Sequence, residues 1–168
     1  MLYSYIVKIR SAVLVFLTHS MALPILKMVR KPEIFPYSKK DLQGFKEGSL
    51  GKDLVQFIHD KNIELLPYYA RHDIKHILLD YDTTDDGEVC LQCFMLGNSH
   101  ISFPVLATVF YGYATMPEHW SKFRQAYKRG KDADCLEKWA WFEILDMDTQ
   151  LLKNIINYKI LKHDNNLV

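Results

Sequence analysis

Two histidines and two carboxylates stand at a spacing that could bind one metal ion. His72 and His76 are four residues apart, so on a helix both imidazoles would project from one face, about one turn apart. Asp73 would lie about 100° round the same helix, near enough to bind the ion or to orient a ligand. Glu88 follows after a short acidic connection, DYDTTDDG, which would let a second helix fold back and bring its carboxylate to the histidines. The pattern predicts a divalent-metal site with the expected ligands His72, Asp73, His76 and Glu88.

The types of ligand limit the identity of the metal. Two imidazoles with one or two carboxylates suit Zn²⁺, Fe²⁺ or Mn²⁺, and a shell made mostly of oxygen atoms and water would also admit Mg²⁺. A histidine pair at this spacing also occurs without a metal, with His72 at the surface and His76 as a hydrogen-bonded core residue. The acidic loop and Glu88 strengthen the metal interpretation, and on ligand chemistry alone both interpretations stay open.

The acidic loop has a rival interpretation as a calcium loop. Its residues match the first half of an EF-hand pattern at Asp82, Thr84, Asp86 and Gly87. The twelfth position is then Cys93, where an EF-hand requires a bidentate glutamate. The sequence therefore excludes an EF-hand.

A helical hydrolase that uses His-Asp pairs is a further alternative. It would need a second pair, and His59-Asp60 and His163-Asp164 are the candidates. Both pairs fall where a helix end or a chain tail is expected, so the sequence argues against this class.

Two basic residues flank the histidine motif. Arg71 and Lys75 could neutralise a phosphate or carboxylate on a bound ligand. The alternative is that both are solvated helix cations whose alkyl stems cover apolar surface. We treat Arg71 and Lys75 as candidate ligand-binding residues, beside the four expected metal ligands.

The three cysteines do not define a metal or redox site. Cys90 and Cys93 form a C-x-x-C, which is found in zinc and redox sites, but no second C-x-x-C completes a four-thiolate set. Both lie in an apolar stretch, VCLQCFML, so we expect small buried apolar side chains. Together with Cys135 they indicate a chain from a reducing compartment.

The elements that must position these residues are helices. Apolar residues recur at helical spacing, no alternating strand pattern occurs, and prolines and glycines mark the breaks. We expect a short helix capped by Asp41, a helix opened by Pro67, apolar helices over 89–101 and 104–114, a helix ended by Gly130 and a last helix from Asp148. The sequence predicts an all-α, single compact domain over residues 1–168, with about seven helices.

Composition and charge narrow the class of protein. The chain has 168 residues, of which 49% are hydrophobic and 24% charged, values typical of a globular domain. The net charge of +1 argues against nucleic acid as the main partner, because phosphate backbones bind proteins with a cationic excess. Residues 1–30 are expected to form one or two apolar helices, too short in their apolar runs to span a membrane, that pack into the core or lie on a membrane surface.

Several blocks of the sequence resemble one known family. One block is an H-D-x-x-H motif that is followed, after eleven residues, by a glutamate. In this chain it reads His72-Asp73-Ile74-Lys75-His76 … Glu88. It is similar to the signature of the fourth coenzyme Q (ubiquinone) biosynthesis protein. GSLGKDLVQF before the motif, YDTTDDGE within it, and AYKRGKDAD and WFEILDMD after it agree in order. The resemblance spans residues 40–160, and Asp80 departs from it where a small residue is expected.

The resemblance implies a helical, peripheral membrane protein of the cytoplasm that forms a homodimer. Its implied ligands are a polyprenyl or other long-chain lipid and a divalent ion at His72, Asp73, His76 and Glu88, and its implied partners are other quinone biosynthesis proteins. The implied activities are oxidative decarboxylation of the prenylated headgroup precursor at ring carbon one and organisation of the biosynthetic complex.

The isoprenoid tail of such a ligand needs a long dry groove. The helices expected over 89–101 and 104–114 could line one, or they could simply form the core. A non-catalytic lipid-binding scaffold with a structural metal is the alternative to an enzyme. It is favoured by the absence of an obvious nucleophile or second acid–base pair near the motif.

Overall fold

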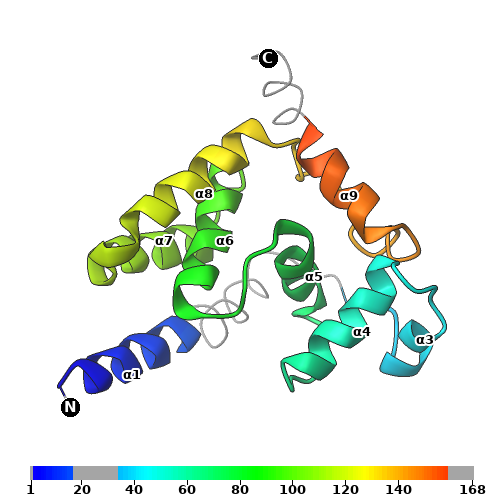
Figure 1. Cartoon of the computed structure of the whole chain (residues 1–168), viewed down its shortest axis with the longest axis horizontal. Coiled ribbons are helices and arrows are strands. Elements are labelled where there is room, and N and C mark those ends of the chain that lie inside the picture. The colour runs from blue at the N-terminus through cyan, green and yellow to red at the C-terminus, as the bar shows by residue number, and fades with distance from the viewer. Residues whose placement is uncertain (1, 17–33, 159–168) are drawn as a thin grey trace. The chain divides into compact units, whose positions relative to one another are not determined.

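The computed structural model describes residues 2–16 and 34–158, and its regular elements in these ranges are all helices (Figure 1). The eight α-helices are α1 (Leu2–Val15), α3 (Lys39–Gln43), α4 (Leu50–Asp60), α5 (Ala70–Leu79), α6 (Asp85–Gly97), α7 (Phe103–Thr115), α8 (Trp120–Asp132) and α9 (Thr149–Ile156). A short 3₁₀-helix, η2 (Pro117–His119), joins α7 to α8. The prediction of an all-α fold is confirmed.

The helices fall into two compact units. One unit holds α1, α6, α7, η2 and α8, and the other holds α3, α4, α5 and α9. The expectation that residues 1–168 form a single domain stays a prediction. Of the apolar region expected over residues 1–30, α1 is a helix as predicted, while residues 17–30 lie outside the described residues.

In the first unit, α6 and α8 cross with their backbones in close contact. A Cβ atom on Gly130 would come within 2.1 Å of the Phe94 carbonyl oxygen, and one on Gly97 within 2.1 Å of the Tyr127 carbonyl oxygen. The Asn98 side-chain amide donates to the Gly130 carbonyl at 3.0 Å across the same crossing. The prediction that Gly130 ends its helix is wrong, because α8 continues to Asp132 and the glycine is needed for the close approach of two helices.

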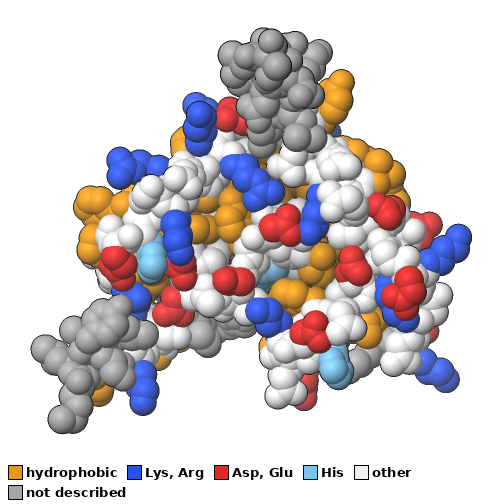
Figure 2. Space-filling model, viewed as in Figure 1, with side chains coloured by type: hydrophobic (Ala, Val, Ile, Leu, Met, Phe, Trp, Pro, Cys, Tyr) orange, Lys and Arg blue, Asp and Glu red, His pale blue; other side chains and the backbone are white. Residues whose placement is uncertain are grey.

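The buried faces of this unit lie mainly on α6. Val89, Leu91 and Phe94 are completely buried, so α6 is a core helix. Helix α7 is different, because Phe103, Leu106 and Phe110 are 57%, 46% and 77% exposed. Hydrophobic side chains also lie open between charged ones on the face shown in Figure 2.

The second unit packs α4 against α3 and α5, and α5 against α9. Its core is apolar, with the buried side chains Leu50, Leu54, Ile58, Ile74, Leu78, Trp141, Leu152 and Ile156. The start of α4 is tied to the segment before α9, because the Gly51 amide donates to the Leu145 carbonyl at 2.7 Å. As predicted, Asp148 marks the start of α9: it is the N-cap residue, and its side chain accepts from the Leu151 amide at 2.7 Å.

Two helix starts differ from the sequence predictions. Helix α3 is capped by Ser38, and Asp41 completes a capping box from inside the helix. Pro67 does not open α5, which begins three residues later at Ala70. The Leu66 carbonyl accepts from the amides of Tyr69 and Ala70, so Pro67 lies in a turn that precedes the helix.

Candidate metal centre

Helix α5 presents both histidines of the motif on one face. The ring centroids of His72 and His76 are 4.6 Å apart, with the planes at 70°. His76 is buried, and His72 is half-buried. The i, i+4 spacing therefore places the two imidazoles side by side, as the sequence predicted.

The tautomer of His76 is fixed by the chain just beyond the helix. Its Nδ1 atom lies 2.8 Å from the Tyr81 carbonyl oxygen, and because a carbonyl can only accept, Nδ1 carries the proton. In the neutral ring, Nε2 is then the nitrogen that can act as a metal ligand. The Phe57 ring stacks on the imidazole, with centroids 6.2 Å apart and planes at 19°.

Glu88 lies in the first turn of α6 and is the third residue of the candidate group. Its side chain is 7% exposed, and Gln92, one turn along, donates from Nε2 to Oε1 at 3.0 Å. Ligand atoms of His72, His76 and Glu88 all lie within 4.8 Å of one another. The three residues are therefore a candidate group for one ion. Two imidazoles and a buried carboxylate fit a divalent metal.

Asp73 is not one of these three residues. Its side chain is 12% exposed, and Oδ1 lies 3.8 Å from His72 Nδ1. The offset of about 100° per helical residue explains why it stands beside His72 instead of joining the group. This position suits an orienting carboxylate, which was the second of the two roles that the sequence allowed.

Arg71 and Lys75 share one aromatic partner. The guanidinium carbon of Arg71 lies 5.4 Å from the ring centroid of Trp141, and Lys75 Nζ lies 5.5 Å from it. These are cation–π distances, and the indole is buried. The structure thus places both cations against Trp141, and their role as ligand-binding residues stays a prediction.

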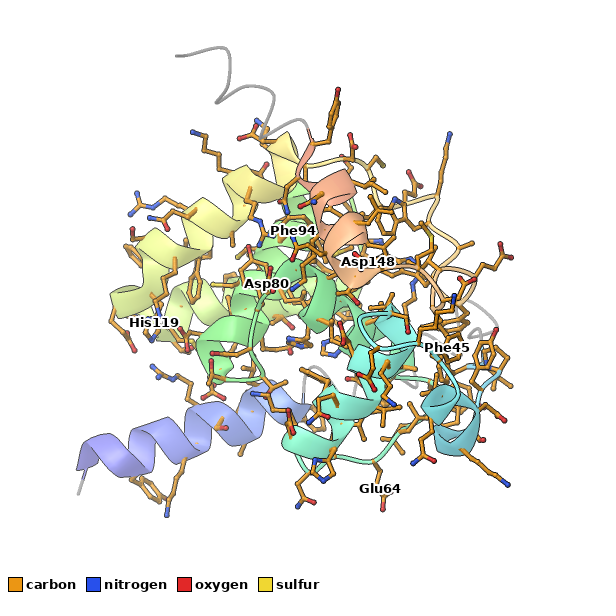
Figure 3. The ribbon with its side chains drawn as sticks, turned by 45° about the vertical axis from the view of Figure 1, so that its right-hand side comes forward. Phe45, Glu64, Asp80, Phe94, His119 and Asp148 are labelled. Atoms are coloured by element: carbon orange, nitrogen blue, oxygen red, sulfur yellow. The ribbon has the colours of Figure 1, made fainter. Side chains whose placement is uncertain are left out.

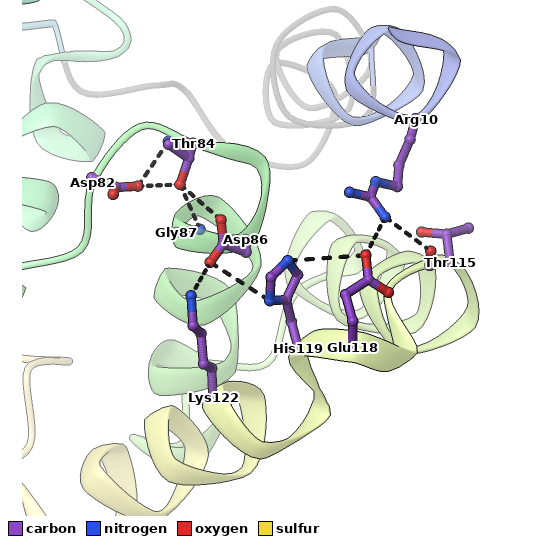
Figure 4. A network of polar contacts seen from close by, with 9 residues as sticks. All are labelled: Arg10, Asp82, Thr84, Asp86, Gly87, Thr115, Glu118, His119 and Lys122. Carbon is purple, nitrogen blue, oxygen red and sulfur yellow. Dashed lines mark hydrogen bonds and ion pairs between the residues drawn. The ribbon is translucent and has the colours of Figure 1, made fainter. Parts of the chain in front are cut away.

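The acidic loop forms a network that fixes the start of α6 (Figure 4). The Thr84 side chain caps the helix by accepting from the Gly87 amide, and the Asp82 carboxylate accepts from the Thr84 amide at 2.9 Å. A Cβ atom on Gly87 would come within 2.4 Å of the Asp82 carbonyl oxygen, so this close turn requires glycine. Lys122 Nζ lies 2.7 Å from Asp86. The loop therefore positions Glu88 through capping and ion pairing.

The cysteine pair is buried, as predicted. Cys90 and Cys93 are 6% and 1% exposed, and burial raises the pKa of the Cys90 thiol to about 11 and that of Cys93 to about 12. Thiols with such pKa values stay protonated at neutral pH. Small apolar side chains, and not thiolate ligands, are what the C-x-x-C provides.

Of the two further His-Asp pairs, one can be placed. His59 and Asp60 are exposed at the end of α4, and they belong to no metal-binding group among the described residues. His163-Asp164 lies outside the described residues. His59 and Asp60 therefore do not supply the second cluster that such a hydrolase would need.

Sequence reasoning missed three groups that support the ligands. Gln92 was detectable, because it follows Glu88 by one helical turn. The Tyr81 carbonyl carried no signal, since any residue has a backbone oxygen. Phe57 reaches His76 from another helix, and helical spacing within α5 could not indicate it.

Comparisons with known proteins agree with this fold. The structure is similar to the crystal structure of a protein from Nostoc punctiforme assigned to ubiquinone biosynthesis. The TM-score is 0.60 at 19% identity, over 90% of this chain and 80% of that one. At this identity the likeness shows the fold alone. No curated protein sequence matches the chain.

The family model of the coenzyme Q (ubiquinone) biosynthesis protein Coq4 matches residues 49–161. The match spans most of the chain and includes all four residues of the motif. This protein belongs to the Coq4 family of ubiquinone biosynthesis proteins, as the sequence resemblance implied.

Proposed function

We propose that the protein binds one divalent metal ion through His72, His76 and Glu88 and acts on a prenylated aromatic acid in ubiquinone biosynthesis. The observation that carries the proposal is the close grouping of two imidazoles and a buried carboxylate in a member of this family. Asp73 orients His72, and the Tyr81 carbonyl accepts the Nδ1 proton of His76, so that Nε2 is the ligand nitrogen in the neutral ring.

The proposed reaction is oxidative decarboxylation of the ring. The bond between ring carbon one and its carboxylic acid group breaks, and carbon dioxide leaves. A hydroxyl derived from water takes its place, and two electrons and two protons pass to dioxygen, which leaves as hydrogen peroxide. A bound metal would supply Lewis-acid stabilisation of the carboxylate and phenolate oxygens. The protein residues hold the ion, fix the histidine tautomer and, through the Phe57 ring, cover one face of His76.

The lipid part of the proposal rests on exposed apolar surface. Phe103, Leu106 and Phe110 follow one another on α7 at spacings of three and four residues and are largely exposed. Such a stripe suits a prenyl tail or a membrane surface. The part of α6 that the sequence offered for a groove is instead buried core.

A peripheral location on a membrane, a homodimer and association with other quinone biosynthesis proteins are further parts of this proposal. No helix among the described residues is long and apolar enough to cross a membrane. The basic residues of α8 are exposed at Arg124, Lys128 and Lys131, and anionic headgroups attract such residues. Cytoplasm is the compartment that we propose.

A scaffold without turnover is the second candidate. The described residues near His72 and His76 include no activated serine or cysteine nucleophile, and the nearest pair of thiols is buried with raised pKa values. In this case the metal would brace helices or hold a lipid headgroup.

Turnover separates the two candidates. The full chain, loaded with Fe²⁺, Mn²⁺, Zn²⁺ or Mg²⁺ in turn, is mixed in air with a prenylated 3,4-dihydroxybenzoate carrying ¹³C in its carboxyl group. Release of ¹³CO₂ that is lost in Glu88→Gln supports the enzyme. Stoichiometric metal without ¹³CO₂ release in any of the four forms supports the scaffold.

A further inference from the structure

An open hollow of about 290 Å³ lies beside His76 in the second unit. Its lining comes from α4, α5 and α9 and from the residue that ends α5. The lining residues are Asp53, Gln56, Phe57, His76, Ile77, Asp80 and Lys153. Ligand pockets for small molecules begin at about 300 Å³, so this volume suits a substituted ring and not a long isoprenoid tail.

The lining combines aromatic surface with both kinds of hydrogen-bonding group. Phe57 and His76, which stack on each other, offer ring faces. Lys153 is a cationic donor, whereas Asp53 and Asp80 are anionic acceptors. An aromatic ring that carries a carboxylate and hydroxyl groups would meet a matching partner for each of its parts. A simple hydrocarbon would make use of none of these polar groups.

Lys153 stands at this hollow in an ion pair that a ligand can replace. Its Nζ lies 2.5 Å from Asp80 Oδ1, and its side chain is 21% exposed. Asp80 is labelled in Figure 3 and ends α5. Its side chain is 61% exposed, and its φ of 56° lies in the left-handed region. An exposed carboxylate loses little when water takes the place of a lysine. The ammonium group is thus a half-buried cation whose present partner is readily exchanged.

We propose that this hollow binds the headgroup of a hydroxylated aromatic acid, with its carboxylate on Lys153 in place of Asp80. Asp53 accepts from a ring hydroxyl, and Phe57 contacts the ring. The inference rests on the proposed function, because His76 is shared by the hollow and by the metal ligands. It adds Lys153 as the residue that selects an acid over a neutral phenol.

The alternative is that Lys153 and Asp80 only tie α9 to the end of α5. The two roles predict different results for the two partners. If the pair is only a structural tie, Lys153→Met and Asp80→Asn break it equally and should change the ligand affinity equally. If Lys153 binds the ligand carboxylate, Lys153→Met removes the binding group, whereas Asp80→Asn frees the lysine from its competing partner. Asparagine tolerates the left-handed conformation at position 80, so Asp80→Asn is compatible with the fold.

The test is binding of 3,4-dihydroxybenzoate to the full chain, measured by calorimetry with and without added Zn²⁺. Lys153→Met should weaken binding by about tenfold to a hundredfold, the range for loss of a charged hydrogen bond, and Lys153→Arg should retain most of it. Asp80→Asn should bind as tightly as the wild type or more tightly. Lys61→Met, an exposed lysine outside the hollow, should leave the affinity unchanged. The neutral analogue 4-methylcatechol should bind independently of Lys153.

Equal weakening in Lys153→Met and Asp80→Asn would overturn the proposal, and so would unchanged affinity in Lys153→Met or no binding by the wild type. If Lys153→Met fails to fold, the side-chain NMR signals of Lys153 in the wild type decide, because they must shift during the titration. The metal content of the same samples distinguishes a failure of the proposed metal-dependent function from a failure of the proposal for the hollow. A wild type without metal contradicts the proposed function, while Lys153-dependent binding without Zn²⁺ still supports the hollow.

Discussion

The Nδ1 atom of His76 lies 2.8 Å from the carbonyl oxygen of Tyr81, just beyond the end of the helix that carries the histidine. The chain can turn back there because Asp80 takes a left-handed conformation. Aspartate tolerates the left-handed region better than most residues. The contact links the end of α5 to His76, a candidate metal ligand.

This contact predicts the tautomer of His76 in the metal-free protein. Nδ1 should carry the proton and Nε2 should not, because the Tyr81 carbonyl accepts. Long-range ¹H–¹⁵N NMR of the metal-free protein at pH 8 distinguishes the two tautomers directly. The opposite tautomer, with the proton on Nε2, would contradict the proposed arrangement of the ligand.

Gly130→Ala should destabilise the protein by about 1–3 kcal/mol, the usual cost of overpacking. The new methyl group would meet the Phe94 carbonyl oxygen of α6 at 2.1 Å, so the two helices would have to separate. Gly44→Ala is the matched control, because its nearest contact is a carbonyl at 3.3 Å and its φ is −77°. Urea unfolding measures both free energies, and equal values for the two variants would refute the close crossing.

Alkylation at pH 7.5 should label Cys135 alone. Burial raises the pKa of Cys90 to about 11 and that of Cys93 to about 12, so both remain neutral thiols, whereas Cys135 is exposed. Mass spectrometry after iodoacetamide treatment should show one adduct on the native protein and three in urea. Rapid labelling of Cys90 or Cys93 in the native protein would reopen a thiolate role for the C-x-x-C.

The pair Arg10–Glu118 should make stability depend on pH in acid. The hydrogen bond from Arg10, at 2.7 Å, is the main cause that holds the pKa of Glu118 below its ordinary value of 4.5. A lowered pKa contributes stability that is complete above pH 4.5 and is lost as the pH falls through the value in the folded protein.

Glu118→Gln should therefore be less stable than the wild type at pH 7, and the difference should shrink below pH 4.5. Denaturant unfolding over this pH range checks the expectation. Glu137→Gln, at another exposed glutamate, is the control and should show a smaller change. A difference between Glu118→Gln and the wild type that stays constant down to pH 3 would contradict the assignment.

Local patterns predicted the helices and the face that carries the histidines, because both depend on residues three or four apart. Asp148 was identified as a helix start for the same reason, since a cap is a local feature. The roles of Gly130 and Pro67 were predicted wrongly. Glycine commonly ends a helix and proline commonly begins one, but Gly130 lies inside α8 at a helix crossing and Pro67 lies in the turn before α5. Only the tertiary structure distinguishes these positions.

The rest of the candidate site depends on contacts between distant residues. Lys153 and Asp80 are 73 residues apart, and nothing in the sequence pairs them. Phe57 meets His76 from a different helix. Glu88 could be expected to join the histidines only because an acidic loop of suitable length precedes it. Asp73 was grouped with the ligands, and its position beside His72 follows from helix geometry.

Metal content of purified variants tests the central claim most directly. A chelator first removes metal from the full chain, which is then reloaded with Zn²⁺ and dialysed. Inductively coupled plasma mass spectrometry measures the number of zinc ions per chain. The wild type should hold about one ion, and His72→Ala, His76→Ala and Glu88→Gln should each bind at least about tenfold more weakly. His59→Ala, at an exposed histidine beside a carboxylate, should bind like the wild type. Unchanged metal content in His76→Ala or in Glu88→Gln would contradict a shared site.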